Sequence, residues 1–152
     1  MKPALDARKV VKALRGAHAR GASRQELLQL AADRIRAAGT PYTSAYLYML
    51  QGGDLMLEAF AGRETEHARI AVGQGVCGTA VAERKDQNVP DVRAVDNYLA
   101  CNAETRSELV VLIERAGSIL GQIDIDSDQV SPFTDAEHQA VREVADALAV
   151  LI

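Results

Sequence analysis

A cysteine stands where the sequence predicts the first turn of a helix. Cys77 lies in the glycine-rich stretch 73–78, and the residues that follow, 79–84, have a helical pattern. Exposed amide N–H groups and the helix dipole favour a thiolate there, so Cys77 is a candidate nucleophile or redox thiol. The alternative is a small buried side chain at a point where glycines let two backbones approach. The spacing alone favours this buried interpretation, because free cysteines are among the residue types most often buried.

A second cysteine, Cys101, lies in a stretch without clear periodicity, residues 93–106, which predicts a long loop. A loop thiol framed by polar residues is accessible to oxidation and can attack an electrophile. The alternative, to which we give equal weight, is a loop thiol that has no chemical role. As a pair, the two cysteines could act as a nucleophile and a resolving thiol.

Three acidic side chains form the other candidate group. Asp124 and Asp126 share one face of an alternating strand, about 7 Å apart, and Glu108 begins the neighbouring strand. Ile123 and Ile125 point to the opposite face, which we expect to be the core. Clustered carboxylates can bind an ammonium group, and their repulsion can keep a proton donor available near neutral pH. Periodicity alone favours a solvated sheet face instead; a metal site that lacks other ligands is a further alternative.

No metal or cofactor is predicted. His18, His67 and His138 are scattered without the spacing of metal ligands, and we expect His18 and His138 on helix surfaces. The sequence contains no Walker loop, dinucleotide-binding fingerprint or nucleophile elbow.

Hydrophobic periodicity predicts a single α+β domain over residues 1–152, with helices at both ends of an antiparallel centre. Ser23 with Glu26, and Thr134 with Glu137, predict capping boxes at two helix starts. The expected elements are helices within 1–38, sheet and pocket loops within 42–126, and a terminal helix over 134–151. Within the central part we expect a hairpin over 42–50 and 55–60, a strand over 67–72, a helix over 79–84, an extended segment over 87–92, and a hairpin over 108–114 and 119–126.

The composition is that of an ordinary soluble globular protein. Seventeen basic and twenty-one acidic side chains give a net charge of −4, which argues against a nucleic-acid surface. The longest apolar run, residues 109–113, is too short to span a membrane, and the first residues do not form a secretory signal. Cysteines without an export signal are typical of a reducing compartment, so we expect a cytoplasmic protein.

Five motifs occur in one order along the chain. They are GVCGTA at 75–80, VPDV at 89–92, LAC at 99–101, SELVV at 107–111 and DIDS at 124–127. In this combination the sequence resembles the free methionine-(R)-sulfoxide reductases, GAF domains that reduce the free amino acid and not protein-bound methionine sulfoxide. The similarity is densest over residues 70–134 and extends more weakly over the whole chain.

The resemblance implies a role for each candidate residue. Cys101 attacks the sulfoxide sulfur, although helix-entry electrostatics alone would favour Cys77 as the nucleophile. Cys77 then resolves the sulfenic acid as a disulfide, which thioredoxin reduces. Glu108, Asp124 and Asp126 hold the substrate and assist protonation of its oxygen. These residue types suit the reaction, because expelling oxygen from sulfur needs a thiolate on one side and a proton donor on the other.

The chain departs from the family pattern at three places. Many members have a third cysteine about ten residues before the position of Cys77, and this chain has none there. Members commonly have a tryptophan in the first strand that lines the substrate site. This chain has no tryptophan, and we expect Tyr46 or Tyr48 to wall the pocket instead. Asn102 replaces a common aspartate.

The resemblance also implies the fold and the partners. It implies a GAF domain, with a roughly six-stranded antiparallel sheet, terminal helices on one face and a ligand pocket on the other. A homodimer through the terminal helices follows from the same resemblance. The implied activity is reduction of free L-methionine (R)-S-oxide; the alternatives are a non-catalytic GAF module that senses a small molecule or oxidation, and a dimerisation scaffold. Convergence of Cys101 with the three carboxylates on one cavity distinguishes them, because only the reductase needs all four groups.

Overall fold

A six-stranded antiparallel sheet forms the centre of the computed structural model, which describes residues 2–96, 98–99 and 103–152. The spatial order of the strands is β3-β2-β1-β6-β5-β4, and every neighbouring pair is antiparallel. The strands are β1 (Ser44–Gln51), β2 (Asp54–Ala61), β3 (Arg69–Ala71), β4 (Gln87–Val89), β5 (Ser107–Arg115) and β6 (Ser118–Ser127). Both predicted hairpins are confirmed, and the predicted extended segment over 87–92 is shorter, because a 3₁₀ turn, η1 (Val92–Ala94), follows β4.

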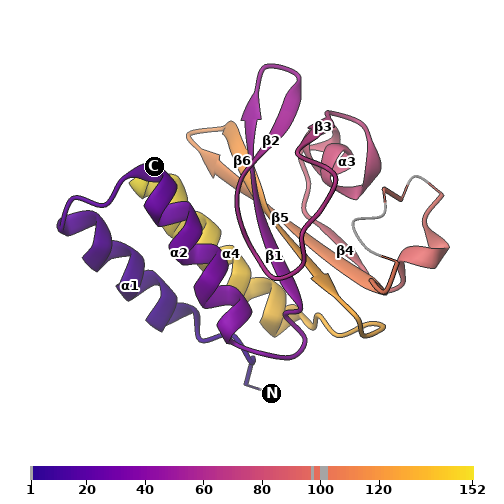
Figure 1. Cartoon of the computed structure of the whole chain (residues 1–152), viewed down its shortest axis with the longest axis horizontal. Coiled ribbons are helices and arrows are strands. Elements are labelled where there is room, and N and C mark those ends of the chain that lie inside the picture. Colours follow the sequence, from indigo (N-terminus) through magenta and orange to yellow (C-terminus); the bar gives the residue numbers. More distant parts are fainter. Residues whose placement is uncertain (1, 97, 100–102) are drawn as a thin grey trace.

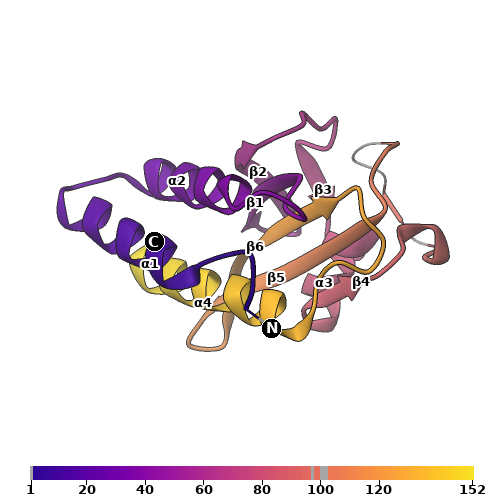
Figure 2. The same ribbon diagram turned by 90° about the horizontal axis from the view of Figure 1, so that it is seen from below.

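The helices divide between the two faces of the sheet. Helices α1 (Ala7–Ala19), α2 (Arg24–Ala37) and α4 (Asp135–Leu151) gather on one face, and the short helix α3 (Gly75–Glu83) lies on the other (Figures 1 and 2). The predicted α+β class is therefore confirmed. No helix in the described parts of the chain combines the length and the apolar character needed to cross a bilayer.

Two apolar clusters lie on opposite faces of the sheet. The larger packs the three terminal helices onto the sheet and includes Ile123 and Ile125. The smaller lies between the sheet and α3 and contains Tyr46, Tyr48 and Cys77. Because side chains alternate along a strand, Asp124 of β6 must project into the region of the smaller cluster.

The predicted capping boxes have different outcomes. At α2, Ser23 and Glu26 exchange both hydrogen bonds, so this box is confirmed. At α4, Thr134 accepts from the Glu137 amide, whereas the Glu137 carboxylate accepts from the Ala4 amide (2.7 Å) and the Tyr42 hydroxyl (2.7 Å). The predicted capping box at Thr134 is therefore wrong in one of its two hydrogen bonds, the one from the Thr134 amide to the Glu137 carboxylate. Glu137 is buried, and its carboxylate binds the N-terminal segment to α4 instead.

A charged cluster joins α4 to the edge of the sheet. Asp86, just before β4, accepts hydrogen bonds from the Leu112 amide (2.9 Å), from His138 Nε2 (2.7 Å) and from Arg142. The expectation that His138 lies on a helix surface is thus only partly right, because its ring is half-buried against Asp86. Burial would raise the pKa of Asp86, but the hydrogen bonds from Arg142, Leu112 and His138 outweigh burial and lower it.

We expect Asp86→Asn to lower the free energy of unfolding by about 2 kcal/mol at neutral pH, because it removes charge-assisted hydrogen bonds in a half-buried site. Because the pKa of Asp86 is lower in the folded chain than in the unfolded chain, ionised Asp86 stabilises the fold at pH values above the ordinary aspartate pKa. This contribution is lost as the pH falls through the lowered pKa. The difference between wild type and variant should therefore shrink in acid. Urea unfolding over a pH series measures it, with the exposed Asp33→Asn as control; an equal loss in both variants would contradict the prediction.

Candidate active site

Helix α3 places Cys77 in its first turn. The helix begins at Gly75, its N-cap residue Gln74 makes no side-chain capping bond, and Cys77 is buried with 4% exposure. Gly78 allows this position, because a Cβ there would lie 2.5 Å from the Ala71 carbonyl oxygen. Cys77 therefore stands at a helix start, as the sequence predicts, and it is also buried, as the alternative interpretation expects.

Strands β5 and β6 place the three carboxylates. Glu108 pairs with Asp126 across the hairpin, and Val110 pairs with Asp124. The three acidic residues are between 0 and 3% exposed. The solvated sheet face that periodicity alone favours is therefore wrong, because α3 covers the face on which these side chains lie.

Cys77, Glu108 and Asp124 converge in space. The Cys77 thiol donates to Glu108 Oε2 at 3.5 Å, and one donor atom from each of the three residues lies within 4.8 Å of the other two. Both carboxylate oxygens of Asp124 are buried, and among the described residues no group meets hydrogen-bond geometry with them. The structure thus brings together a thiol and two of the three predicted acidic groups, with Asp126 beside Glu108 in the sheet.

One residue of the site was not singled out from the sequence. Gln122, fully buried on β6, donates from Nε2 to the Cys77 carbonyl oxygen at 3.0 Å. This bond ties the first turn of α3 to the strand that carries the aspartates. The signal was present in the sequence, because Gln122 continues the alternation of Asp124 and Asp126 on the same face.

The carboxyl groups have perturbed acidity. Burial raises the pKa of Glu108 well above its ordinary value, and the charge of neighbouring Asp124 raises it further. Burial also raises the pKa of Asp124. Two buried acids this close together cannot both ionise easily, so loss of the second proton is disfavoured. A proton donor therefore lies next to the Cys77 sulfur.

The two tyrosines predicted to wall a pocket lie on the same face. In β1, Tyr46 pairs with Asp124 of β6, and Tyr48 pairs with Gln122. Their rings are fully buried, and their hydroxyls donate at 2.7 Å to the carbonyl oxygens of Arg63 and His67. Their hydroxyls are thus already engaged in hydrogen bonds with the backbone.

A loop residue covers the crevice at Cys77. Leu99 lies against Gly75, where an added Cβ would come within 2.8 Å of the Leu99 Cβ. The space between Leu99, Cys77 and Glu108 is too narrow for a water molecule. Cys101, the predicted nucleophile, lies outside the described residues, as does its neighbour Asn102.

Comparison with known proteins places the chain in a family. The profile of the GAF domain family matches residues 23–152. The chain is 35% identical to the structure of a type II free methionine-R-sulfoxide reductase from Thermoplasma acidophilum, with a TM-score of 0.81, over 84% of this chain and 91% of that one. This chain belongs to the free methionine-R-sulfoxide reductase family of GAF domains. The predicted GAF fold is thereby confirmed.

Two further members of the reductase family extend the comparison. The free methionine-R-sulfoxide reductase of Escherichia coli is 40% identical over 100 residues, which are 66% of this chain and 60% of that protein. The reductase of Neisseria meningitidis, solved in complex with its substrate, has a TM-score of 0.87 at 28% identity, over 97% of this chain and 88% of that one. The aligned part spans about three fifths of the length of the first curated relatives.

We expect Glu108→Gln to raise the free energy of unfolding at about pH 8 by roughly 1–2 kcal/mol, because it removes a buried acid that resists ionisation. The pKa of Glu108 is higher in the folded chain than in the unfolded chain, so the unfolded chain releases this proton more readily. The free energy of unfolding of the wild type therefore falls as the pH rises above the pKa of Glu108 in the unfolded chain. The gain should vanish below about pH 4, where the acid is protonated in both states.

Urea unfolding at both pH values measures this difference, and Glu114→Gln, an exposed acid on the same strand, is the control. A Glu108→Gln variant less stable than wild type at alkaline pH would contradict the prediction.

Proposed function

We propose that this chain reduces free L-methionine (R)-S-oxide to methionine through a cycle of two cysteines that a thioredoxin-type dithiol recharges. The observation that carries the proposal is the meeting of Cys77 with Glu108 and Asp124 in one buried space. Membership of the reductase family supports it. The cycle needs free thiols, so we place the protein in a reducing, cytoplasmic compartment.

The first step consumes the sulfoxide. The Cys101 thiolate attacks the sulfoxide sulfur, and the carboxyl group of Glu108 delivers a proton to the oxygen. The protonated oxygen then transfers to the Cys101 sulfur as its bond to the substrate sulfur breaks. The bond between the two sulfurs breaks as well, so methionine leaves and Cys101 becomes a sulfenic acid. Two electrons pass from the cysteine sulfur to the sulfoxide sulfur. The raised pKa of Glu108 supports this role, because it extends the pH range over which the group remains a proton donor.

The second step regenerates a reducible enzyme. The Cys77 sulfur attacks the sulfenic acid, a disulfide forms, and water leaves. Glu108, left ionised by the first step, accepts the Cys77 proton across the 3.5 Å hydrogen bond that already joins them and passes it to the departing hydroxyl group, which leaves as water. An external dithiol then reduces the disulfide and is itself oxidised. One carboxyl group thus serves as acid and then as base.

Selection of a free amino acid follows from the same side chains. Asp124 and Asp126 are buried and acidic, so they provide counter-charges for the α-ammonium group that only a free amino acid carries. The Tyr46 ring stacks on Phe60 with centroids 6.0 Å apart and offers an apolar wall for the methyl group.

The proposal predicts stereospecific turnover. With thioredoxin, thioredoxin reductase and NADPH, we expect oxidation of NADPH with the free (R)-sulfoxide and none with the (S) form. Cys101→Ser should abolish turnover, whereas Cys77→Ser should release about one methionine per chain and then stop. Multiple turnover in Cys101→Ser would contradict the mechanism. No turnover by reduced wild type with either thioredoxin or dithiothreitol would favour a ligand-binding GAF module.

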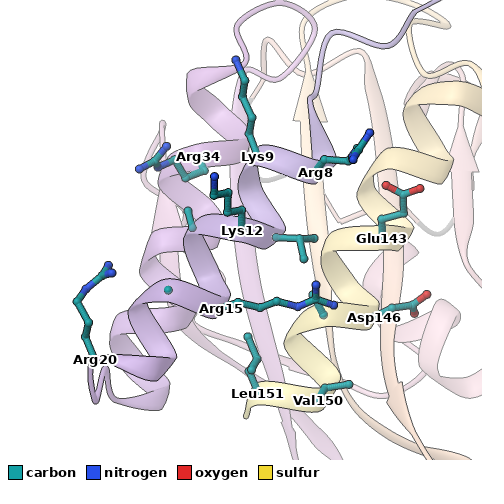
Figure 3. Close-up of a pocket in the computed structure, with 14 residues that line it drawn as sticks. Arg8, Lys9, Lys12, Arg15, Arg20, Arg34, Glu143, Asp146, Val150 and Leu151 are labelled. Carbon is teal, nitrogen blue, oxygen red and sulfur yellow. The ribbon is translucent and has the colours of Figure 1, made fainter.

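We also propose that a second copy of the chain docks on the terminal helices. A groove of about 1290 Å³ runs between α1 and α4 (Figure 3), with basic side chains such as Lys12 and Arg15 on one side. Glu143 and Asp146 of α4 line the other side, and Val150 is 78% exposed at its end. Opposite charges on the two sides let α1 of one copy face α4 of another around a two-fold axis.

A dimer of this kind should dissociate when one side of the groove is reversed in charge. We expect light scattering to give a dimer for wild type and a monomer for the double variant Lys12→Glu with Arg15→Glu. Adding Glu143→Lys and Asp146→Lys to that variant should restore the dimer. A wild-type monomer at every concentration would refute the proposal.

A further inference from the structure

We propose that Cys77, Glu108 and Asp124 also form a binding site for a zinc ion. In tetrahedral zinc sites the metal lies about 2.3 Å from sulfur and about 2.0 Å from a carboxylate oxygen, which places the two ligand atoms about 3.5 Å apart. The Cys77 Sγ to Glu108 Oε2 distance is 3.5 Å. Two of the donors thus already have the separation that a shared zinc ion requires.

The third donor points to a cation independently. Asp124 is completely buried, and apart from Glu108 and Cys77 themselves no described residue offers its oxygens a hydrogen bond. Its donor atom lies within 4.8 Å of those of Cys77 and Glu108, so about 1 Å of closure brings it to the spacing of a zinc ligand. A positive ion between the three groups compensates the desolvation that burial imposes on the carboxylates.

The scaffold around the three donors is rigid. They come from α3, β5 and β6, and the sheet pairing of Val110 with Asp124 fixes the two strands in register. The Gln122 side chain holds the Cys77 carbonyl oxygen, which orients the first turn of α3 as outer-shell groups orient metal ligands. A site built on helices and strands needs little reorganisation to bind an ion.

The donor set selects the kind of metal. Magnesium and calcium require six or more oxygen ligands, and a thiolate disfavours both ions. Zinc accepts a mixture of one thiolate and carboxylates. Bound zinc would occupy both the resolving thiol and the acid, so it would block recycling; this consequence, unlike binding itself, rests on the proposed function.

Cobalt(II) is a spectroscopic probe for the site. We expect anaerobic titration of the reduced, full-length chain with Co²⁺ to give one ion per chain and a thiolate-to-cobalt charge-transfer band, which Zn²⁺ then removes. The band should be absent in Cys77→Ser and present in Cys101→Ser. Glu108→Gln and Asp124→Asn should weaken binding by more than about 100-fold, beyond the 10–100-fold typical of outer-shell groups. The exposed Glu114→Gln should bind like wild type.

The experiment separates the metal site from the enzyme, because it uses neither sulfoxide nor thioredoxin. No band in wild type, or an unchanged band in Cys77→Ser, would overturn the proposal whatever the reductase assay gives. Protection of Cys77 from iodoacetamide by Zn²⁺, with the peptide of Cys101 as internal reference, reports on the site without relying on a variant that must fold. Equal alkylation of Cys77 with and without Zn²⁺ would also overturn it.

Discussion

Three carboxyl groups and a thiol share one dry space on the face of β5 and β6 opposite the terminal helices. Removing carboxylates from water is costly unless they stay protonated or meet a cation. In this chain burial raises the pKa values of both Glu108 and Asp124, and the charge of Asp124 raises the pKa of Glu108 further. The proposed proton donor, the proposed ammonium site and the contact with Cys77 all depend on this cost of burying carboxylates. A metal ion bound between the groups would lower the same cost by supplying a positive charge.

One face of the sheet carries most of the apolar core, and the other face carries the candidate active site. The terminal helices bury the larger apolar cluster on one face, and Glu137 and Asp86 fasten α4 to the N-terminal segment and to the sheet edge. That face supplies the stability that lets the other hold unfavourable charges. Helix α3 is short, and glycine contacts and the bond from Gln122 hold its first turn against the sheet.

Much of this arrangement is visible in the sequence. Alternation along β6 placed Asp124 and Asp126 on one face and the isoleucines on the core face, and Ser23 marked the start of α2. What covers a strand face is set by distant segments, so periodicity could not show that α3 buries the carboxylates. Glu137 and His138 were misassigned for the same reason, because their partners, Tyr42 and Asp86, are remote in sequence. Cys101 lies outside the described residues, and its role stays a prediction.

Infrared spectroscopy of the carboxyl groups tests the protonated acid pair most directly. At neutral pH the reduced wild-type chain should show the carbonyl stretch of a protonated, dry carboxylic acid, well separated from ionised carboxylates. This band should persist above the ordinary range of glutamate and should shift or disappear in Glu108→Gln, but not in Glu114→Gln. A wild-type spectrum with every carboxyl group ionised at neutral pH would contradict the acid pair and the proton source assigned to it.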